Sequence, residues 1–305
     1  MGIIMRYDKP PLSIDQQIDL LISRGMIVED RFLAARYLTH INYYRLRAYW
    51  LVYEDPEKSA VHRFKKGTHF SQVLSLYIFD RKFRLLVLEA IERVEISFRT
   101  RFAYVLGTRY GSHAHLEEGL FKSSYTHNQC LENLREEFNR SRETFIEHYK
   151  TKYRQPDLPP IWAACEIMTL GQLSMWFKNL KRRSDRQEIA SVFKIDASIL
   201  GSFMHHLTHV RNIVAHHGRL WNRRLTITMT IPIRPQEITS DFHTESNRNI
   251  YNTLVMLGYL LRSMSHGTTW IERMKRLIEE SEVADPSMMG FPKKWQALPT
   301  WSQRS

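Results

Sequence analysis

The longest uninterrupted helical pattern in the chain limits its fold more than any other feature. Between Gly67 and Gly107 the sequence contains neither glycine nor proline, and apolar residues recur throughout "FSQVLSLYIFDRKFRLLVLEAIERVEISFRTRFAYVLG". This stretch predicts one very long helix or two helices in sequence, because nothing inside it would end a helix. We expect it to form the backbone of the core, against which the other helices pack.

Helical patterns also occupy most of the remaining chain. "SIDQQIDLLISRG" begins with Ser13 and Gln16 at capping-box spacing and ends at Gly25, so it predicts a short amphipathic helix. "LTITMTIPI", residues 225–233, alternates β-branched side chains as a short strand or extended segment would. The sequence therefore predicts an all-α fold with long central helices and a short β or extended insertion. Further helices are expected at 29–50, 130–153, 161–182, 185–193 and 197–217, with a final pair within 244–282.

The helical pattern breaks between residues 54 and 69, where Pro56 and Gly67 interrupt it. With 305 residues and 43% hydrophobic content, the chain is long enough to fill a core in one large or two moderate domains. We expect three parts, namely a small N-terminal helical module at 1–66, a helical domain at 67–283 and a C-terminal tail at 284–305.

The charge of the chain points to a polyanionic partner. Lys and Arg number 44 against 32 Asp and Glu, which gives a net charge of +12 and favours nucleic acid or an anionic membrane surface. No apolar run reaches the roughly 20 residues of a bilayer span, and no signal peptide is recognisable. Cys130 and Cys165 have neither metal-site nor disulfide-framework spacing. We therefore expect a soluble, cytoplasmic protein without membrane association.

One segment concentrates titratable and cationic groups. "HLTHVRNIVAHHGRLWNRR", residues 206–224, holds four His and four Arg. On a helical wheel, residues 203, 207, 210 and 214 form an apolar stripe, and His205, His209, Asn212 and His216 form a polar one. His217 falls beside the apolar stripe, so we expect it to be a core-edge histidine bonded to a carbonyl.

Three interpretations of the polar stripe compete. Its histidines could complement the dipole at the helix C-terminus. His205, His209 and His216 could bind Zn²⁺, although no nearby Cys or carboxylate completes the site, and no metal or cofactor is predicted. Arg211 and His216 also form an Arg-x-x-x-x-His pattern, which metal-independent ribonucleases use. Similar spacings recur elsewhere in this chain, so the pattern by itself is weak.

The wider sequence around this pattern resembles a known family. "RNIVAHHGRLWNR" is similar to the signature of the abortive-infection Abi proteins (AbiD/AbiF-like), within the HEPN superfamily of helical ribonucleases. "KPPLSIDQQIDLLISRGM", "YLTHINYYRLRAYW", "RSRETFIEHYKTKY" and "LPPIWAACEIMTLGQLSMWFKNL" precede it in the family's order. The resemblance extends from about residue 9 to 225, and it departs from the family at Val214, where a Cys is frequent.

The resemblance implies a fold, a site and a biological role. It implies an all-helical bundle of the HEPN type, with Arg211 and His216 at the two defining positions of the ribonuclease motif and Asn212 as the polar residue that follows the Arg. It also implies a role in phage defence or toxin-like growth arrest, controlled by a small noncoding RNA. The alternative function is a noncatalytic protein that clamps a structured small RNA.

The residue types suit metal-independent RNA cleavage. RNA carries its own nucleophile, the 2′-OH, so the enzyme must move protons and stabilise charge on the phosphorus. Imidazoles exchange protons near neutral pH, because histidine ordinarily has a pKa of about 6.5. A guanidinium such as that of Arg211 donates two parallel hydrogen bonds to a phosphate. The expected products are a 2′,3′-cyclic phosphate and a free 5′-hydroxyl.

Basic and aromatic residues elsewhere are candidates for holding RNA. "INYYRLRAYW" interleaves Tyr and Arg, which makes the N-terminal module an RNA-binding candidate, although packing could equally explain its tyrosines. Trp221 could stack on a base or anchor the core. The candidates are Tyr44, Arg45, Arg47, Arg182, Arg183, Arg219, Trp221, Arg223 and Arg224, with His205, His209, Arg142 and His148 as secondary positions.

A single motif supplies too few groups for the whole reaction. One suitably placed His provides a base or an acid, but not both, and an open helix face does not exclude water. A twofold homodimer that pairs the 205–216 faces would place two histidines around one cleft. The alternative is an active monomer, in which another helix, such as that of His148, faces the motif.

Overall fold

The computed structural model of the protein describes residues 10–57, 62–265 and 267–302. Its contacts divide the chain into two compact units, Met1–Lys82 with Ser281–Ala284 and Phe83–Glu280 with Asp285–Ser305. Helices make up both units, and in the described residues β-pairing is limited to isolated bridges. The all-α fold class predicted from the sequence is therefore confirmed.

The first unit consists of α1 (Ile14–Ser23), α2 (Arg31–His40), α3 (Tyr43–Trp50) and the beginning of α4. The capping box at the start of α1 is present, since Gln16 N donates to Ser13 Oγ and Ser13 N donates to the Gln16 side chain. The single helix expected at 29–50 is wrong. Ile41 is extended, and the Asn42 side chain accepts a hydrogen bond from the N–H of Tyr44, which caps a new helix.

Helix α4 (Phe70–Tyr110) is a single long helix, the first of the two alternatives that the sequence left open. It is continuous for 41 residues and passes through Gly107 without a break. A side chain at Gly107 would meet Ile161 at 3.4 Å, so a small residue lets α7 pack close to α4. Within the second unit, one stripe of α4 is fully buried at Phe83, Val87, Val94, Phe98 and Phe102.

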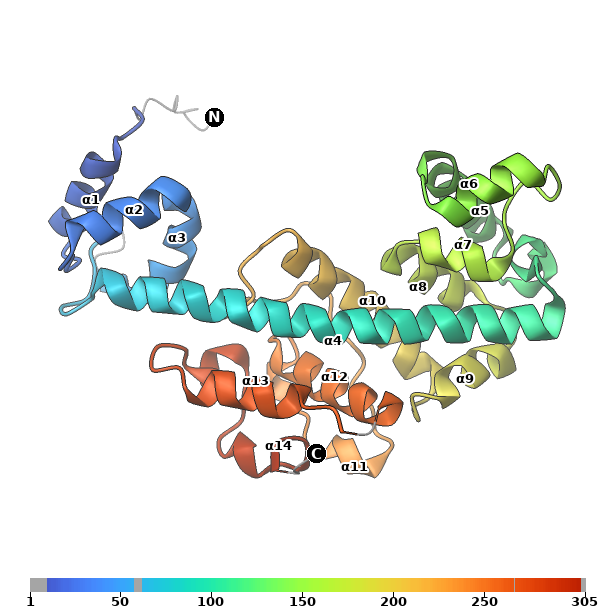
Figure 1. The fold of residues 1–305 in the computed structure, drawn as a ribbon. Coiled ribbons are helices and arrows are strands. Elements are labelled where there is room, and N and C mark those ends of the chain that lie inside the picture. Colours follow the sequence, from blue (N-terminus) through green and yellow to red (C-terminus); the bar gives the residue numbers. More distant parts are fainter. Residues whose placement is uncertain (1–9, 58–61, 266, 303–305) are drawn as a thin grey trace, which may run out of the picture. The chain divides into compact units, whose positions relative to one another are not determined.

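Other helices of the second unit lie on both sides of this part of α4, with α12 and α13 next to it on one side and α7 and α8 on the other (Figure 1). Trp270 Nε1 of α13 donates to the carbonyl of Leu86 at 2.7 Å, and Arg99 donates to the carbonyl of Cys165 in α7. Their bounds are α5 Ser124–Arg140, α6 Thr144–Lys152, α7 Ile161–Ile167, α8 Leu170–Asn179, α9 Arg183–Ser191, α10 Ala197–Ala215, α11 Gln236–Thr239, α12 Tyr251–Met264, α13 Trp270–Glu279 and α14 Pro299–Ser302.

Two further expected helices are each split in the structure. The pattern at 130–153 divides into α5 and α6 because Ser141 is extended, and the pattern at 161–182 divides into α7 and α8. Thr169 caps α8 through a capping box with Gln172, a local signal that the apolar pattern concealed. Residues 225–233 belong to no named strand and run as an extended or irregular segment.

The C-terminal residues pack into the second unit. Trp295 and Trp301 are 5% and 2% exposed, and their rings meet edge to face with centroids 5.1 Å apart. The buried carboxylate of Asp241 accepts hydrogen bonds from the backbone N–H and the hydroxyl of Thr300. Residues 285–302 therefore contribute to the core.

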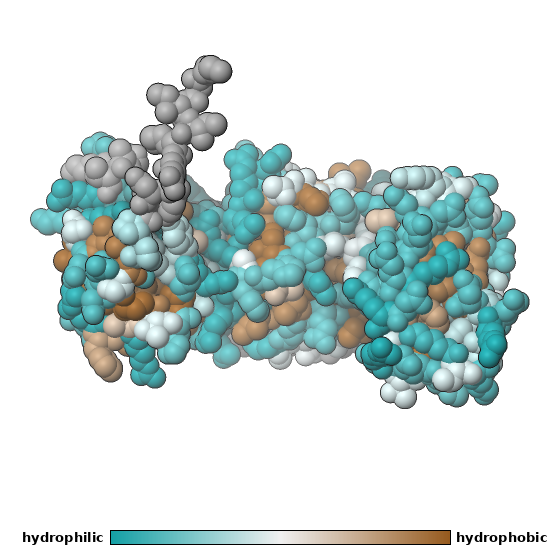
Figure 2. Space-filling model, turned by 90° about the horizontal axis from the view of Figure 1, so that it is seen from above, coloured by the Kyte–Doolittle hydropathy of each residue, from teal (hydrophilic) through white to brown (hydrophobic). Residues whose placement is uncertain are grey.

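The surface is mainly hydrophilic on the face drawn in Figure 2, where hydrophobic residues form patches separated by polar and charged ones. Across the described ranges, none of the helices combines the length and the apolar character needed to cross a bilayer.

Candidate functional site at the end of helix α10

Helix α10 has the two faces that its sequence predicts. The side chain of Asp196 caps its first turn by accepting a hydrogen bond from Ser198 N at 2.7 Å. The apolar stripe of residues 203, 207, 210 and 214 is buried, whereas Asn212 and His216 are exposed. The helix therefore presents its polar stripe at the surface of the second unit.

The helix ends in a Schellman motif directly at the candidate site. Gly218 N donates to Ile213 O at 2.8 Å and His217 N donates to Val214 O at 3.0 Å, with His217 in the left-handed conformation at φ 57°. His216 is the C-cap. The expectation that His217 is a buried core-edge residue is wrong, because the chain has left the helix there and the side chain is exposed.

Gly218 is required by this helix ending. A Cβ at this position would lie 3.1 Å from Ile213 O and 3.3 Å from Ile213 Cγ2. Movement of the Ile213 carbonyl away from this Cβ would weaken the hydrogen bond from Gly218 N that closes the motif. We expect Gly218→Ala to lower the free energy of unfolding by about 1–3 kcal/mol, measured by urea denaturation.

Gly119→Ala is the matched control, because a Cβ at Gly119 meets nothing within 4 Å. Its free energy of unfolding should stay unchanged or rise slightly, since alanine restricts the unfolded chain. Equal destabilisation by both substitutions would contradict the close approach at Gly218.

His206 is the histidine of this helix that belongs to the core. It is 1% exposed, with Nδ1 2.7 Å from Ile227 O and Nε2 2.8 Å from Thr253 Oγ1. A carbonyl can only accept, so Nδ1 carries the proton and Nε2 accepts from the Thr253 hydroxyl. Burial lowers the pKa of His206 to about 4. This ring is thus held neutral in one tautomer.

The structure brings Arg211 and Asn212 together at the surface. Arg211 Nη1 lies 3.4 Å from Asn212 Oδ1, and the backbone N–H of His216 donates to the Asn212 carbonyl at 3.0 Å. The three residues therefore share the last turn of α10. Among the described residues, the exposed His216 ring makes no side-chain hydrogen bond, so both of its nitrogens face solvent or a ligand.

His209 and His205 lie along the same stripe, and each is influenced by residues outside α10. His209 Nε2 is 3.1 Å from the Thr226 hydroxyl, and partial burial and the charge of Arg223 lower the pKa of His209. Partial burial, followed by the charges of Lys178 and His209, lowers the pKa of His205. The spacing of residues in the sequence did not identify Thr226 or Lys178, which lie 17 and 27 positions from His209 and His205 and come near them only in the fold.

The segment after α10 keeps cations beside the motif. Arg223 Nη1 donates to the carbonyl of Arg219 at 3.3 Å, Arg219 donates to the carbonyl of Asn222, and Arg224 is exposed. Trp221 is only 1% exposed and is a core anchor, the second of the two alternatives considered for it. Its burial leaves no face of the ring for stacking on a base.

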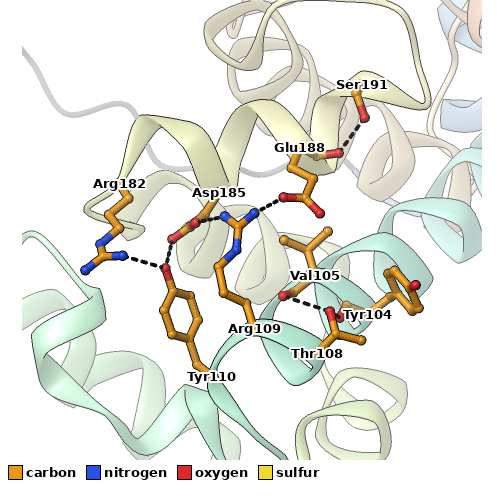
Figure 3. Close-up of polar contacts among 9 residues, drawn as sticks. All are labelled: Tyr104, Val105, Thr108, Arg109, Tyr110, Arg182, Asp185, Glu188 and Ser191. Carbon is orange, nitrogen blue, oxygen red and sulfur yellow. Dashed lines mark hydrogen bonds and ion pairs between the residues drawn. The ribbon is translucent and has the colours of Figure 1, made fainter.

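Arg182 and Arg183 at the start of α9 point to different partners. Arg182 Nη1 is 3.4 Å from the Tyr110 hydroxyl, and its guanidinium lies 5.8 Å from the centre of that ring (Figure 3). Arg183 is 78% exposed and its Nη2 is 3.2 Å from Asp196 Oδ2. Only Arg183 is therefore directed toward the beginning of α10.

Two candidates of the first unit, Tyr44 and Arg47, line a cavity of about 670 Å³ together with Arg24 and Tyr43. Tyr44 is 65% exposed and Arg45 is exposed, while Arg47 Nη2 lies 3.4 Å from His62 Nε2. Tyr43 packs edge to face on Trp50 with ring centroids 4.8 Å apart. Packing thus accounts for Tyr43, and Tyr44 remains open to a ligand.

The secondary candidates Arg142 and His148 are distant from the α10 stripe in sequence, and the residues around them are different ones. Arg142 is 88% exposed and 3.8 Å from Glu147, and the exposed His148 shares a depression of about 350 Å³ with Trp162. Within the described ranges, no group of three or more His, Cys, Asp or Glu side chains is arranged to hold a metal ion.

Fold and site together define a class, an all-α protein in which a half-buried Arg and an exposed Asn and His lie together at a helix C-terminus. The family model of the Abi-like proteins matches residues 36–222, more than half of the chain. The chain therefore belongs to the Abi-like family of abortive-infection proteins. The matched range contains Arg211, Asn212 and His216. Comparison with curated proteins and with solved structures gives no match.

Proposed function

We propose that the protein is a metal-independent endoribonuclease of the HEPN type that acts as an abortive-infection, phage-defence effector. The observation that carries the proposal is the C-terminal end of α10, where Arg211 hydrogen-bonds Asn212 one helical turn before the exposed His216, inside the range that the family model matches. This arrangement offers a proton-transfer group, a phosphate ligand and an orienting amide on one accessible surface.

The proposed reaction uses the RNA's own nucleophile. The 2′-oxygen attacks the adjacent phosphorus as its proton is removed, the bond from phosphorus to the 5′-oxygen breaks, and that oxygen takes up a proton. His216 serves one of these proton transfers, Arg211 neutralises charge on the nonbridging oxygens and Asn212 orients the phosphate or the His216 ring. The products are a 2′,3′-cyclic phosphate and a 5′-hydroxyl, and DNA cannot react by this route.

Two partners complete the proposal. A second copy of the chain, with its α10 stripe facing the first, would supply the second proton-transfer histidine and cover the open face. A small structured noncoding RNA would hold the activity in check. The arginines at 219, 223 and 224 beside the motif provide positive charge for either RNA.

Incubation of the purified protein with mixed RNA, with and without EDTA, tests this function. We expect cleavage that survives EDTA and leaves 2′,3′-cyclic phosphate ends, and we expect a DNA of the same sequence to stay intact. Tight binding with intact RNA would instead support the noncatalytic RNA-clamping protein. Cleavage that EDTA abolishes would contradict the metal-independent mechanism.

A further inference from the structure

A second basic site lies at the opposite end of α10 from the Arg211–His216 turn. A cavity of about 570 Å³ opens there between α8, α9 and the first turns of α10. Four cations and one carboxylate line it, together with small and apolar residues. The charged residues are Lys122, Lys178, Arg183, Arg186 and Asp196.

The cations of this cavity are placed by hydrogen bonds to the protein. Lys122 Nζ donates to the carbonyl of Lys178 at 2.9 Å, and Arg186 donates to the carbonyls of Leu180 and Lys181. Each contact uses only part of the donor capacity of the ammonium or guanidinium group. The remaining N–H groups are available to a ligand in the cavity.

Helix α9, which carries two of these arginines, is anchored to the end of α4. Arg109 of α4 reaches between Asp185 and Glu188 of α9 and pairs with both carboxylates (Figure 3). Tyr110 donates from its hydroxyl to Asp185, which is 1% exposed, at 2.9 Å. This network holds the backbone of α9 so that Arg183 and Arg186 keep their positions at the cavity.

The cavity carries more positive charge than its own carboxylate can balance. Asp196 accepts hydrogen bonds from the N–H and the hydroxyl of Ser198, and its one ion pair among the described residues is with Arg183. Burial and the charge of Arg186 lower the pKa of Lys122, and burial lowers the pKa of Lys178. A bound anion would offset both effects, since it supplies the missing negative charge.

The polar stripe of α10 connects this cavity with the candidate site. Ser198 and Ser202 line the cavity, and the next members of the same face are His205, His209 and then Asn212 and His216. Spacings of three and four residues keep these side chains on one side of the helix. At a rise of about 1.5 Å per residue, Ser198 and His216 are about 27 Å apart along α10.

We infer that the cavity at the start of α10 is a phosphate subsite for a single RNA strand that runs along the polar stripe to the Arg211–His216 turn. This inference rests on the function proposed above. A stacked strand rises about 3.4 Å per nucleotide along its axis and therefore covers about 27 Å with about eight nucleotides, whereas an extended strand needs fewer. Occupancy of both ends thus requires a minimum RNA length.

Binding of 2′-O-methyl oligoribonucleotides to the full chain tests the inference without cleavage, because these probes lack the nucleophile. Oligomers of about four and about ten nucleotides bracket the expected span. The wild-type protein should bind the longer probe on the order of tenfold more tightly than the shorter one. The double variant Lys178→Gln, Arg183→Gln should lose most of this ratio, and its salt slope should fall by about 1.4.

The matched control is the double variant Lys152→Gln, Arg140→Gln, which also removes one Lys and one Arg. Arg140 is paired with the carboxylate of Glu137, as Arg183 is paired with that of Asp196. This control should keep the wild-type ratio of affinities for the longer and the shorter probe. If the double variant at the cavity does not fold, the single variant Lys178→Gln replaces it in the test. A cavity variant that keeps the full ratio would overturn the inference. If the wild-type protein does not cleave RNA, the proposed function is refuted, but the ratio of affinities for the two probes can still be measured.

Discussion

Replacement of His216 by alanine is expected to lower the rate of RNA cleavage by about 10²–10⁴-fold, the usual contribution of a general acid or base. The free energy of unfolding should change little, because the ring is exposed and makes no side-chain hydrogen bond among the described residues. The rate of product formation and the urea midpoint measure the two effects separately. Overexpression of the variant should no longer arrest growth.

His40→Ala is a suitable control, because His40 is also an exposed histidine at the end of a helix, α2. It should cleave RNA at the wild-type rate. His216→Ala protein that remains fully active and toxic would remove His216 from the mechanism.

The same variant tests the proposed pairing of two chains. Excess His216→Ala protein, mixed with wild type under conditions of subunit exchange, should reduce activity below the level that dilution alone produces. The reason is that mixed dimers would carry only one of the two histidines. Proportional dilution, together with a monomeric mass in light scattering, would contradict the composite site and leave the ribonuclease proposal standing.

Acidification is expected to destabilise the second unit strongly, because two histidines that are buried and neutral in the folded protein take up protons when the chain unfolds. Burial lowers the pKa of His206 to about 4 and that of His115 to about 3, whereas an unfolded histidine has a pKa of about 6.5. Below about pH 6.5 the unfolded chain binds more protons, so stability falls with pH down to these lowered values. Each group contributes about 1.4 kcal/mol per pH unit, or about 4 kcal/mol for both at pH 5.

Urea denaturation at pH 7.5 and pH 5 measures this loss, and His206→Gln isolates one half of it. The glutamine does not titrate, so the difference in unfolding free energy between the two pH values should shrink by about 2 kcal/mol. The variant is also less stable at pH 7.5, because it loses the paired hydrogen bonds to Ile227 and Thr253. An unchanged pH dependence in His206→Gln would show that His206 is not the group that titrates.

Local sequence signals determined the elements on which the site depends. The absence of Gly and Pro between Gly67 and Gly107 predicted one very long helix or two in sequence, because nothing local would end a helix there, and α4 is the first of these alternatives. Alternation of apolar and polar residues at helical spacing placed Asn212 and His216 on the surface of α10, since periodicity alone decides which face of a helix avoids water. Arg211 and Asn212 could likewise be placed on the last turn.

Helix ends were less predictable, because they depend on single caps within continuous apolar patterns. Asn42 and Thr169 begin new helices inside stretches that looked uninterrupted. The position where α10 ends also decided that His217 is exposed. His217 leaves the core because it lies one residue past the C-cap, in the left-handed conformation.

Only the tertiary structure decided which distant groups meet. His206 became the core histidine because Ile227 and Thr253, 21 and 47 positions away, supply its hydrogen bonds. Lys122 reaches Lys178 across 56 positions to line the basic cavity. The sequence by itself determined the two faces of α10 and the exposure of Asn212 and His216, because the spacing of residues along one helix sets these features. The hydrogen bonds of His206 and the charge of the cavity arise from contacts between segments that are distant in sequence, which no local pattern encodes.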